Sequence, residues 1–161
     1  MQVGFIYRPN IVTNTYIILL NTMENIFMVG LSFESIKKKI AAQCAWNDTT
    51  NLATLPPIVN PMSNADVDGV IWLKIIDFSC RFAGYVSDVE QSDDIVRIVM
   101  HADRVPERSR ERIYHFIEEF VVCSVLEELY SPQQQAKTIV ARNATMVRSV
   151  ESKLRQMLCL M

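Results

Sequence analysis

The side chains best suited to chemistry in this sequence are four cysteines and two histidines. The cysteines stand 36, 43 and 36 residues apart, at Cys44, Cys80, Cys123 and Cys159. Structural zinc sites usually take their thiolates from closely spaced Cys-x-x-Cys pairs, and the sequence has no such pair. His101 and His115 neighbour none of the cysteines. The spacing predicts no metal site and favours free thiols in a reducing compartment.

Two further patterns with catalytic potential are incomplete. Glu118 and Glu119 are adjacent on a predicted helix, so they point to different sides and cannot act as a carboxylate pair. Gly30 stands between a predicted strand and a predicted helix, but the second glycine and the Gly-Lys-Ser/Thr of a phosphate-binding loop are missing. We therefore predict no cofactor. An enzyme is the minor hypothesis, since only the fold could bring a histidine beside a serine or cysteine.

Composition limits the class of protein. A chain of 161 residues forms one domain or a little more, and its 50% hydrophobic and 21% charged residues are typical of a globular fold. The net charge of −2 and the lack of a basic stripe give no reason to expect nucleic-acid binding. No apolar run approaches the roughly 20 residues of a membrane span, and no secretory signal is predicted.

Hydrophobic periodicity predicts a helix-rich α/β fold. Strands are expected over residues 2–7, 15–21, 25–30 and 95–102. Helices are expected over residues 32–43, 65–82 and 106–130, the first capped by Ser32 and the second by Ser63 or Asn64. The proline-containing stretch 46–62 is predicted as a linker or long loop, and the acidic stretch 87–94 is predicted to be exposed.

Residues 131–161 carry the clearest pattern. Seven residues recur at alternating separations of 4 and 3, as at the a and d positions of a coiled coil. This predicted seam consists of Ala136, Val140, Asn143, Val147, Val150, Leu154 and Met157. Ser131 is expected to cap the helix, with Pro132 at the first position and Gln134 completing a capping box. Asn143 is the one polar seam residue, and a buried asparagine can fix the register of paired helices.

The seam allows two interpretations. It is either an ordinary core helix, or a coiled-coil helix whose partner lies outside the chain, since no second helix of this kind is evident in the sequence. We expect a small α/β domain with flanking helices over residues 1–105. A long helical segment with a coiled-coil-like C-terminal helix would follow over residues 106–161.

Several segments share motifs with one known family. The best match is Gln-x-Ala-Lys at residues 134–137 followed by Asn-Ala-Thr at residues 143–145. Weaker matches are the strand and glycine at residues 26–30, the prolines at 56–57, the strand at 94–102 and Arg-Gln at 155–156. Together they resemble the central-stalk gamma subunit of the rotary ATP synthase over about residues 25–156. The family's long N-terminal helix has no counterpart, so the resemblance implies a divergent or N-terminally truncated member.

The resemblance implies a non-catalytic subunit that couples proton flow to ATP synthesis by rotating inside a ring of catalytic subunits. Its partners would be other ATP synthase subunits, in the catalytic and rotor rings. It would lie on the matrix side of the mitochondrial inner membrane, within a complex and without a direct membrane span. Four basic residues would face the ring from the outer side of the shaft: Arg142, Arg148, Lys153 and Arg155. Their spacing equally permits a solvated helix face.

A second hypothesis needs no assembly of this kind. The chain would be a soluble, α-rich interaction module, cytoplasmic and without enzymatic activity, that dimerises or binds a partner helix through the same seam. A small α/β enzyme is the third hypothesis.

Overall fold

The computed structural model describes residues 26–50, 66–101 and 105–159. The strands predicted over residues 2–7 and 15–21, and most of the predicted linker, lie outside these ranges. In chain order the elements are β1 (Ile26–Ser32), α1 (Phe33–Thr50), α2 (Val67–Arg81), β2 (Val86–Ser92), β3 (Ile95–His101), α3 (Glu107–Tyr130), the short 3-10 helix η2 (Gln134–Ala136) and α4 (Lys137–Cys159). The predicted helix-rich fold with a small sheet and a long C-terminal helix is confirmed.

The sheet is antiparallel, with β3 in the middle between β1 and β2. Every second side chain of β1 and β3 is buried, as expected for strands that cover a core on one face. The cross-strand pairs on that face are Phe27 with Met100, Val29 with Ile98, and Leu31 with Val96. β2 was not predicted, since residues 87–94 were expected only to be acidic and exposed. Its side chains are exposed or half-buried, so the backbone pairing to β3 left no hydrophobic pattern in the sequence.

Two segments cap the start of α1. The Ser32 hydroxyl accepts a hydrogen bond from the Ser35 backbone N–H at 3.2 Å and donates to the Asp94 carboxylate at 2.8 Å. Asp94 also accepts from the backbone N–H of Glu34 at 3.2 Å. Ser32 was predicted as the cap, whereas Asp94 arrives from the β2–β3 turn. A carboxylate here suits the positive end of the helix dipole.

The first helix is longer than predicted. It runs to Thr50 instead of residue 43, so the first part of the predicted loop at 46–62 is helical. The reason is that Cys44 and Asn47 extend the buried stripe of Ile36 and Ile40 at helical spacing. The second helix begins later than predicted. Asp66 caps it, instead of Ser63 or Asn64, by accepting from the Gly69 backbone N–H at 3.0 Å.

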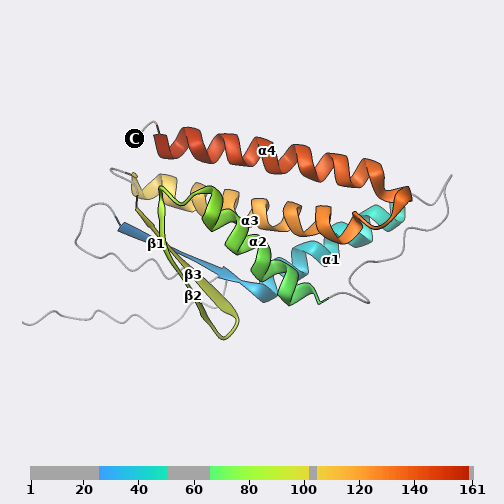
Figure 1. Cartoon of the computed structure of the whole chain (residues 1–161), viewed down its shortest axis with the longest axis horizontal. Coiled ribbons are helices and arrows are strands. Elements are labelled where there is room, and N and C mark those ends of the chain that lie inside the picture. Colours follow the sequence, from blue (N-terminus) through green and yellow to red (C-terminus); the bar gives the residue numbers. More distant parts are fainter. Residues whose placement is uncertain (1–25, 51–65, 102–104, 160–161) are drawn as a thin grey trace, which may run out of the picture.

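α3 is the central element of the fold (Figure 1). The sheet, α1 and α2 pack on one side of it, and α4 lies antiparallel along another. Its predicted apolar stripe is confirmed as buried, at Ile113, Ile117, Phe120, Val121, Val125 and Leu129. One buried apolar cluster therefore joins side chains from both halves of the described chain.

The beginning of α4 differs from the sequence prediction. Ser131 is the C-cap of α3, and its backbone N–H donates to the Glu127 carbonyl at 3.0 Å. After the turn and η2, α4 starts at Lys137. The predicted capping box with Pro132 and Gln134 is therefore wrong. The serine and proline instead belong to the turn that reverses the chain between two long helices.

Candidate functional site

The predicted seam is buried inside the chain. Asn143, Val147, Val150 and Leu154 are at most 5% exposed, and α4 packs along α3. The helix therefore has a partner within the chain, as the interpretation of an ordinary core helix predicts. The buried stripe also departs from the heptad pattern at both ends of α4. Ile139 and Leu158 are buried, whereas the predicted seam residues Val140 and Met157 are half-buried. The first seam residue, Ala136, is buried but belongs to η2. A straight helix rotates by about 20° per heptad away from a 3.5-residue repeat, which accounts for this shift at both ends.

The four basic residues do not form one face. Arg142 donates to the Asn47 side-chain oxygen on α1 at 2.9 Å. The Lys153 ammonium lies 5.6 Å from the centre of the Phe116 ring. Arg155 bonds to Glu151 at 2.8 Å and lies over the ring of Phe82, the residue that follows α2. Arg148 is exposed, and among the described residues it has no polar contact or ion pair. Three of the four thus have structural neighbours within the fold.

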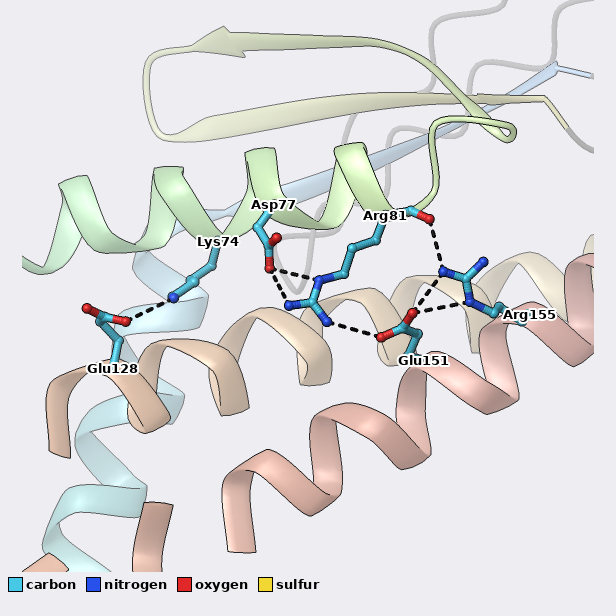
Figure 2. Close-up of polar contacts among 6 residues, drawn as sticks. All are labelled: Lys74, Asp77, Arg81, Glu128, Glu151 and Arg155. Carbon is cyan, nitrogen blue, oxygen red and sulfur yellow. Dashed lines mark hydrogen bonds and ion pairs between the residues drawn. The ribbon is translucent and has the colours of Figure 1, made fainter. Parts of the chain in front are cut away.

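Two separate groups of charged side chains join α2 to its neighbours, one to α3 and the other to α4 (Figure 2). Lys74 pairs with Glu128 of α3 at 3.2 Å. Arg81 pairs with Asp77 at 3.0 Å and with Glu151 of α4 at 3.2 Å. Hydrogen bonds from Arg155 and Arg81 hold the pKa of Glu151 below its ordinary range. Each of these side chains has an oppositely charged partner, so the two groups help to hold α2 against α3 and α4.

A second buried polar contact lies between α1 and α3. The Glu118 side chain is 2% exposed, and it accepts from the Ser35 hydroxyl at 3.0 Å. The Lys39 ammonium forms an ion pair with the same carboxylate. A buried carboxylate is tolerated when it is paired and hydrogen-bonded, as here. Glu118 is therefore a structural group, in keeping with the prediction that it forms no carboxylate pair with Glu119.

A groove with a volume of about 710 Å³ lies between α1, α3 and α4. We call it the α1/α3/α4 groove. Its lining residues are Lys39, Ala42, Gln43 and Trp46 of α1, His115, Glu119, Val122, Cys123 and Leu126 of α3, and Arg142, Asn143 and Met146 of α4. Trp46 is 61% exposed and Met146 is 37% exposed, so both leave apolar surface accessible at the groove. The groove thus combines accessible apolar surface with several polar groups.

Arg142 and Asn143 were singled out from the sequence, and the structure brings both to this groove. Asn143 is 3% exposed, and its amide nitrogen has no hydrogen-bond acceptor in the described part of the chain. No neighbouring helix within the described ranges therefore uses this nitrogen to fix its register. Trp46 escaped the sequence analysis because the helix was expected to end at residue 43. With the helix continued, Lys39, Ala42 and Trp46 fall on one face at helical spacing.

Cys123 lines the groove, and the pKa of its thiol depends on its burial and on the charges around it. Burial, the largest effect, and the charge of Glu119 raise the pKa of this thiol to about 11, and Arg142 opposes the change. Cys123 therefore lies within reach of a negative charge from α3 and a positive charge from α4. A thiol with such a pKa is almost fully protonated near neutral pH and is a poor nucleophile.

Nothing else in the described ranges suggests a reactive centre. No group of three or more His, Cys, Asp or Glu side chains in those ranges is arranged to hold a metal ion. None of the described helices combines the length and apolar character needed to cross a membrane. Comparisons of the chain with protein-family models, with curated proteins and with solved structures found no match. The α1/α3/α4 groove is therefore the candidate functional site.

Proposed function

We propose that the chain is a non-catalytic protein-interaction module that binds an amphipathic helical segment of another protein in the α1/α3/α4 groove. The observation that carries this proposal is the placement of Trp46 and Met146. They are two of the three large apolar side chains exposed in the described ranges, and both line the same groove. The third, Leu73, lies outside its lining.

The chemistry of the lining suits a helix as the occupant. Grooves between helices bind the apolar face of a partner helix through side chains spaced three and four residues apart. Tryptophan and methionine are enriched at protein interfaces, and the flexible methionine adapts to different partners. Val122 and Leu126, one turn apart on α3, provide the apolar floor beneath them. The seam of α4, in contrast, is already occupied by the chain's own core.

The proposal can be tested with a designed peptide of about 15 residues, long enough to approach a stable isolated helix. The peptide carries leucines on one face and uncharged glutamines on the other, with a fluorescent label for anisotropy measurements. We expect saturable binding that Met146→Lys weakens at least about tenfold, because it places a charge in the apolar contact. The matched control is Leu73→Lys, an exposed apolar residue outside the groove, which should leave binding unchanged.

Three results would overturn the proposal. One is the absence of saturable binding by the wild-type chain, and another is an equal loss of binding in the control variant. The third concerns self-association. If sedimentation shows a dimer of the chain that Met146→Lys dissociates, the groove is occupied by a second copy and not by a different protein.

The central-stalk hypothesis stays a prediction. The observation that favours it is the antiparallel pair of α3 and α4, with 24 and 23 residues, which would form the shaft within this chain. In an assembled ATP synthase, Arg148→Ala should then lower ATP synthesis without lowering the thermal stability of the isolated chain, since Arg148 is the basic residue that the fold leaves exposed. Unchanged ATP synthesis would count against the hypothesis.

A further inference from the structure

We infer that the α1/α3/α4 groove selects an acidic partner, whose carboxylate binds at Arg142 and Asn143 while its apolar face covers Trp46 and Met146. This inference depends on the proposed function and specifies the chemistry of the partner. It is carried by two neighbouring residues of α4 that line the groove with hydrogen-bond donors.

The first donor is the buried amide of Asn143. The side chain is 3% exposed and lines the groove, and its nitrogen has no acceptor in the described ranges. A buried donor without an acceptor is costly, and most buried polar groups in folded proteins are paired. The nitrogen is covered by neighbouring atoms, so an oxygen brought by a ligand would satisfy it once the side chain turns toward the groove. The donor therefore indicates an occupant that carries an acceptor at this position.

The second donor is the Arg142 guanidinium. Its Nη2 donates to the Asn47 oxygen at 2.9 Å, which ties the end of the side chain to α1 at the border of the groove. A guanidinium has five N–H donors in a planar fork, so a second acceptor can bind beside the first. Carboxylates match this geometry with two parallel hydrogen bonds, and such charged bonds are about twice as strong as neutral ones. Arg142 is thus held where it can receive a carboxylate.

The remaining charges of the groove set the position of the acid. Lys39 already has the buried Glu118 as its counter-ion, so it contributes little net charge. Glu119 lies on α3 and makes that side of the groove unfavourable for an anion, as its effect on Cys123 shows. The carboxylate is therefore expected on the α4 side, beside Arg142, with the leucine-like face of the partner on Trp46 and Met146.

The test uses three labelled peptides with the same leucine face and a polar face of glutamate, glutamine or lysine. We expect the acidic peptide to bind about tenfold more tightly than the neutral one, the gain given by one good charged hydrogen-bond pair. The basic peptide should bind more weakly than the neutral one. Added salt should weaken the acidic peptide's binding and have little effect on the neutral peptide.

Two variants of the whole chain test which arginine causes the preference for the acidic peptide. Arg142→Gln should remove most of the preference for the acidic peptide, so that the ratio of the acidic to the neutral peptide's affinity approaches one. Arg148→Gln, an exposed arginine of the same helix outside the groove, is the matched control and should keep the full preference.

Each outcome has one interpretation. If the neutral peptide binds but the acidic one gains nothing, or if Arg142→Gln keeps the preference, this inference is wrong and the interaction groove still stands. If none of the three peptides binds, the proposed function fails and the inference fails with it.

Discussion

Arg81 of α2 and Glu151 of α4 are joined by an ion pair of 3.2 Å, although they are 70 residues apart in the sequence. Arg155 completes the link, because it bonds to the same carboxylate at 2.8 Å and to the Arg81 main-chain oxygen at 3.1 Å (Figure 2). The carboxylate thus connects the end of α2 to α4, the helix that lines the groove. This connection makes the stability of the fold dependent on pH.

Glu151→Gln should lower the free energy of unfolding by about 0.5–1 kcal/mol near neutral pH, the upper part of the range for partly exposed pairs. The two arginines lower the pKa of Glu151 in the folded state, so its contribution is complete above the unfolded value of about 4.3. It is lost as the pH falls through the lower folded pKa. Urea titrations of both proteins from about pH 7 to pH 3 should therefore converge on the acid side. A difference that grows toward low pH would contradict this assignment.

The helix α4 should derive its stability from its buried stripe and not from its charges. Leu154 is 0% exposed, so Leu154→Ala should cost about 2–5 kcal/mol through lost burial and the cavity left behind. Val147→Asp would place an unpaired carboxylate against α3, with a cost of at least several kcal/mol. Arg148→Ala should cost less than about 0.5 kcal/mol. Thermal melting of the three variants checks this order, and an equal tolerance of Val147→Asp and Arg148→Ala would refute the packing of α4.

Much of the fold could be predicted from residues at helical spacing. The stripes of α2 and α3 and the strand β3 were correct because each buries a single continuous face, which local periodicity records. β2 left no such record, since its side chains are exposed or only half-buried on both faces. The start of α4 was misplaced because Ser131 and Pro132 fit a helix cap as well as they fit the turn after α3.

The site was less accessible to sequence analysis. Asn143 and Arg142 stood out by residue type, but their common groove exists only because α1 approaches α4 across α3. The partner of α4 was sought outside the chain because α3 shows no heptad pattern of its own. A helix buried on several sides, like α3, has apolar residues around most of its circumference. Periodicity alone then cannot distinguish the apolar residues that contact α4 from those that contact the rest of the core.

The cap formed by Ser32 and Asp94 offers a test of a contact between distant segments. Asp94→Ala should cost about 1 kcal/mol, since it removes the acceptor for the Glu34 backbone N–H at the start of α1. Ser32→Ala should have an effect of similar size. The double variant should cost less than the sum of the two, because the side chains share a 2.8 Å hydrogen bond. Strict additivity in chemical denaturation would show that the two caps act independently.

Cys123 should react slowly with thiol reagents. The pKa of its thiol is raised from 9.0 to about 11. Near pH 8 the thiolate fraction is therefore about 100-fold lower than that of a cysteine with the ordinary pKa. Variants that retain a single cysteine, either Cys123 or the exposed Cys80, can be compared by the rate of a colorimetric disulfide reagent. The Cys80 protein should react at least about 100-fold faster, since exposure adds to the thiolate effect. Similar rates would contradict the burial of Cys123 in the groove.

Asn143→Leu separates a binding role from a structural one. Leucine has the same branched shape as asparagine, with bulkier methyl groups in place of the amide oxygen and nitrogen, and it carries no polar atom. The variant should therefore keep or raise the free energy of unfolding, by up to about 1 kcal/mol, because it removes a buried donor without an acceptor. If this donor serves the acidic partner, the same variant should weaken binding of the acidic peptide several-fold and leave the neutral peptide unaffected. Urea denaturation and peptide anisotropy on the same preparation give both values. A more stable protein with undiminished acidic-peptide binding would show that Asn143 does not contact the ligand, and a strongly destabilised protein would show that its amide is bonded within the fold.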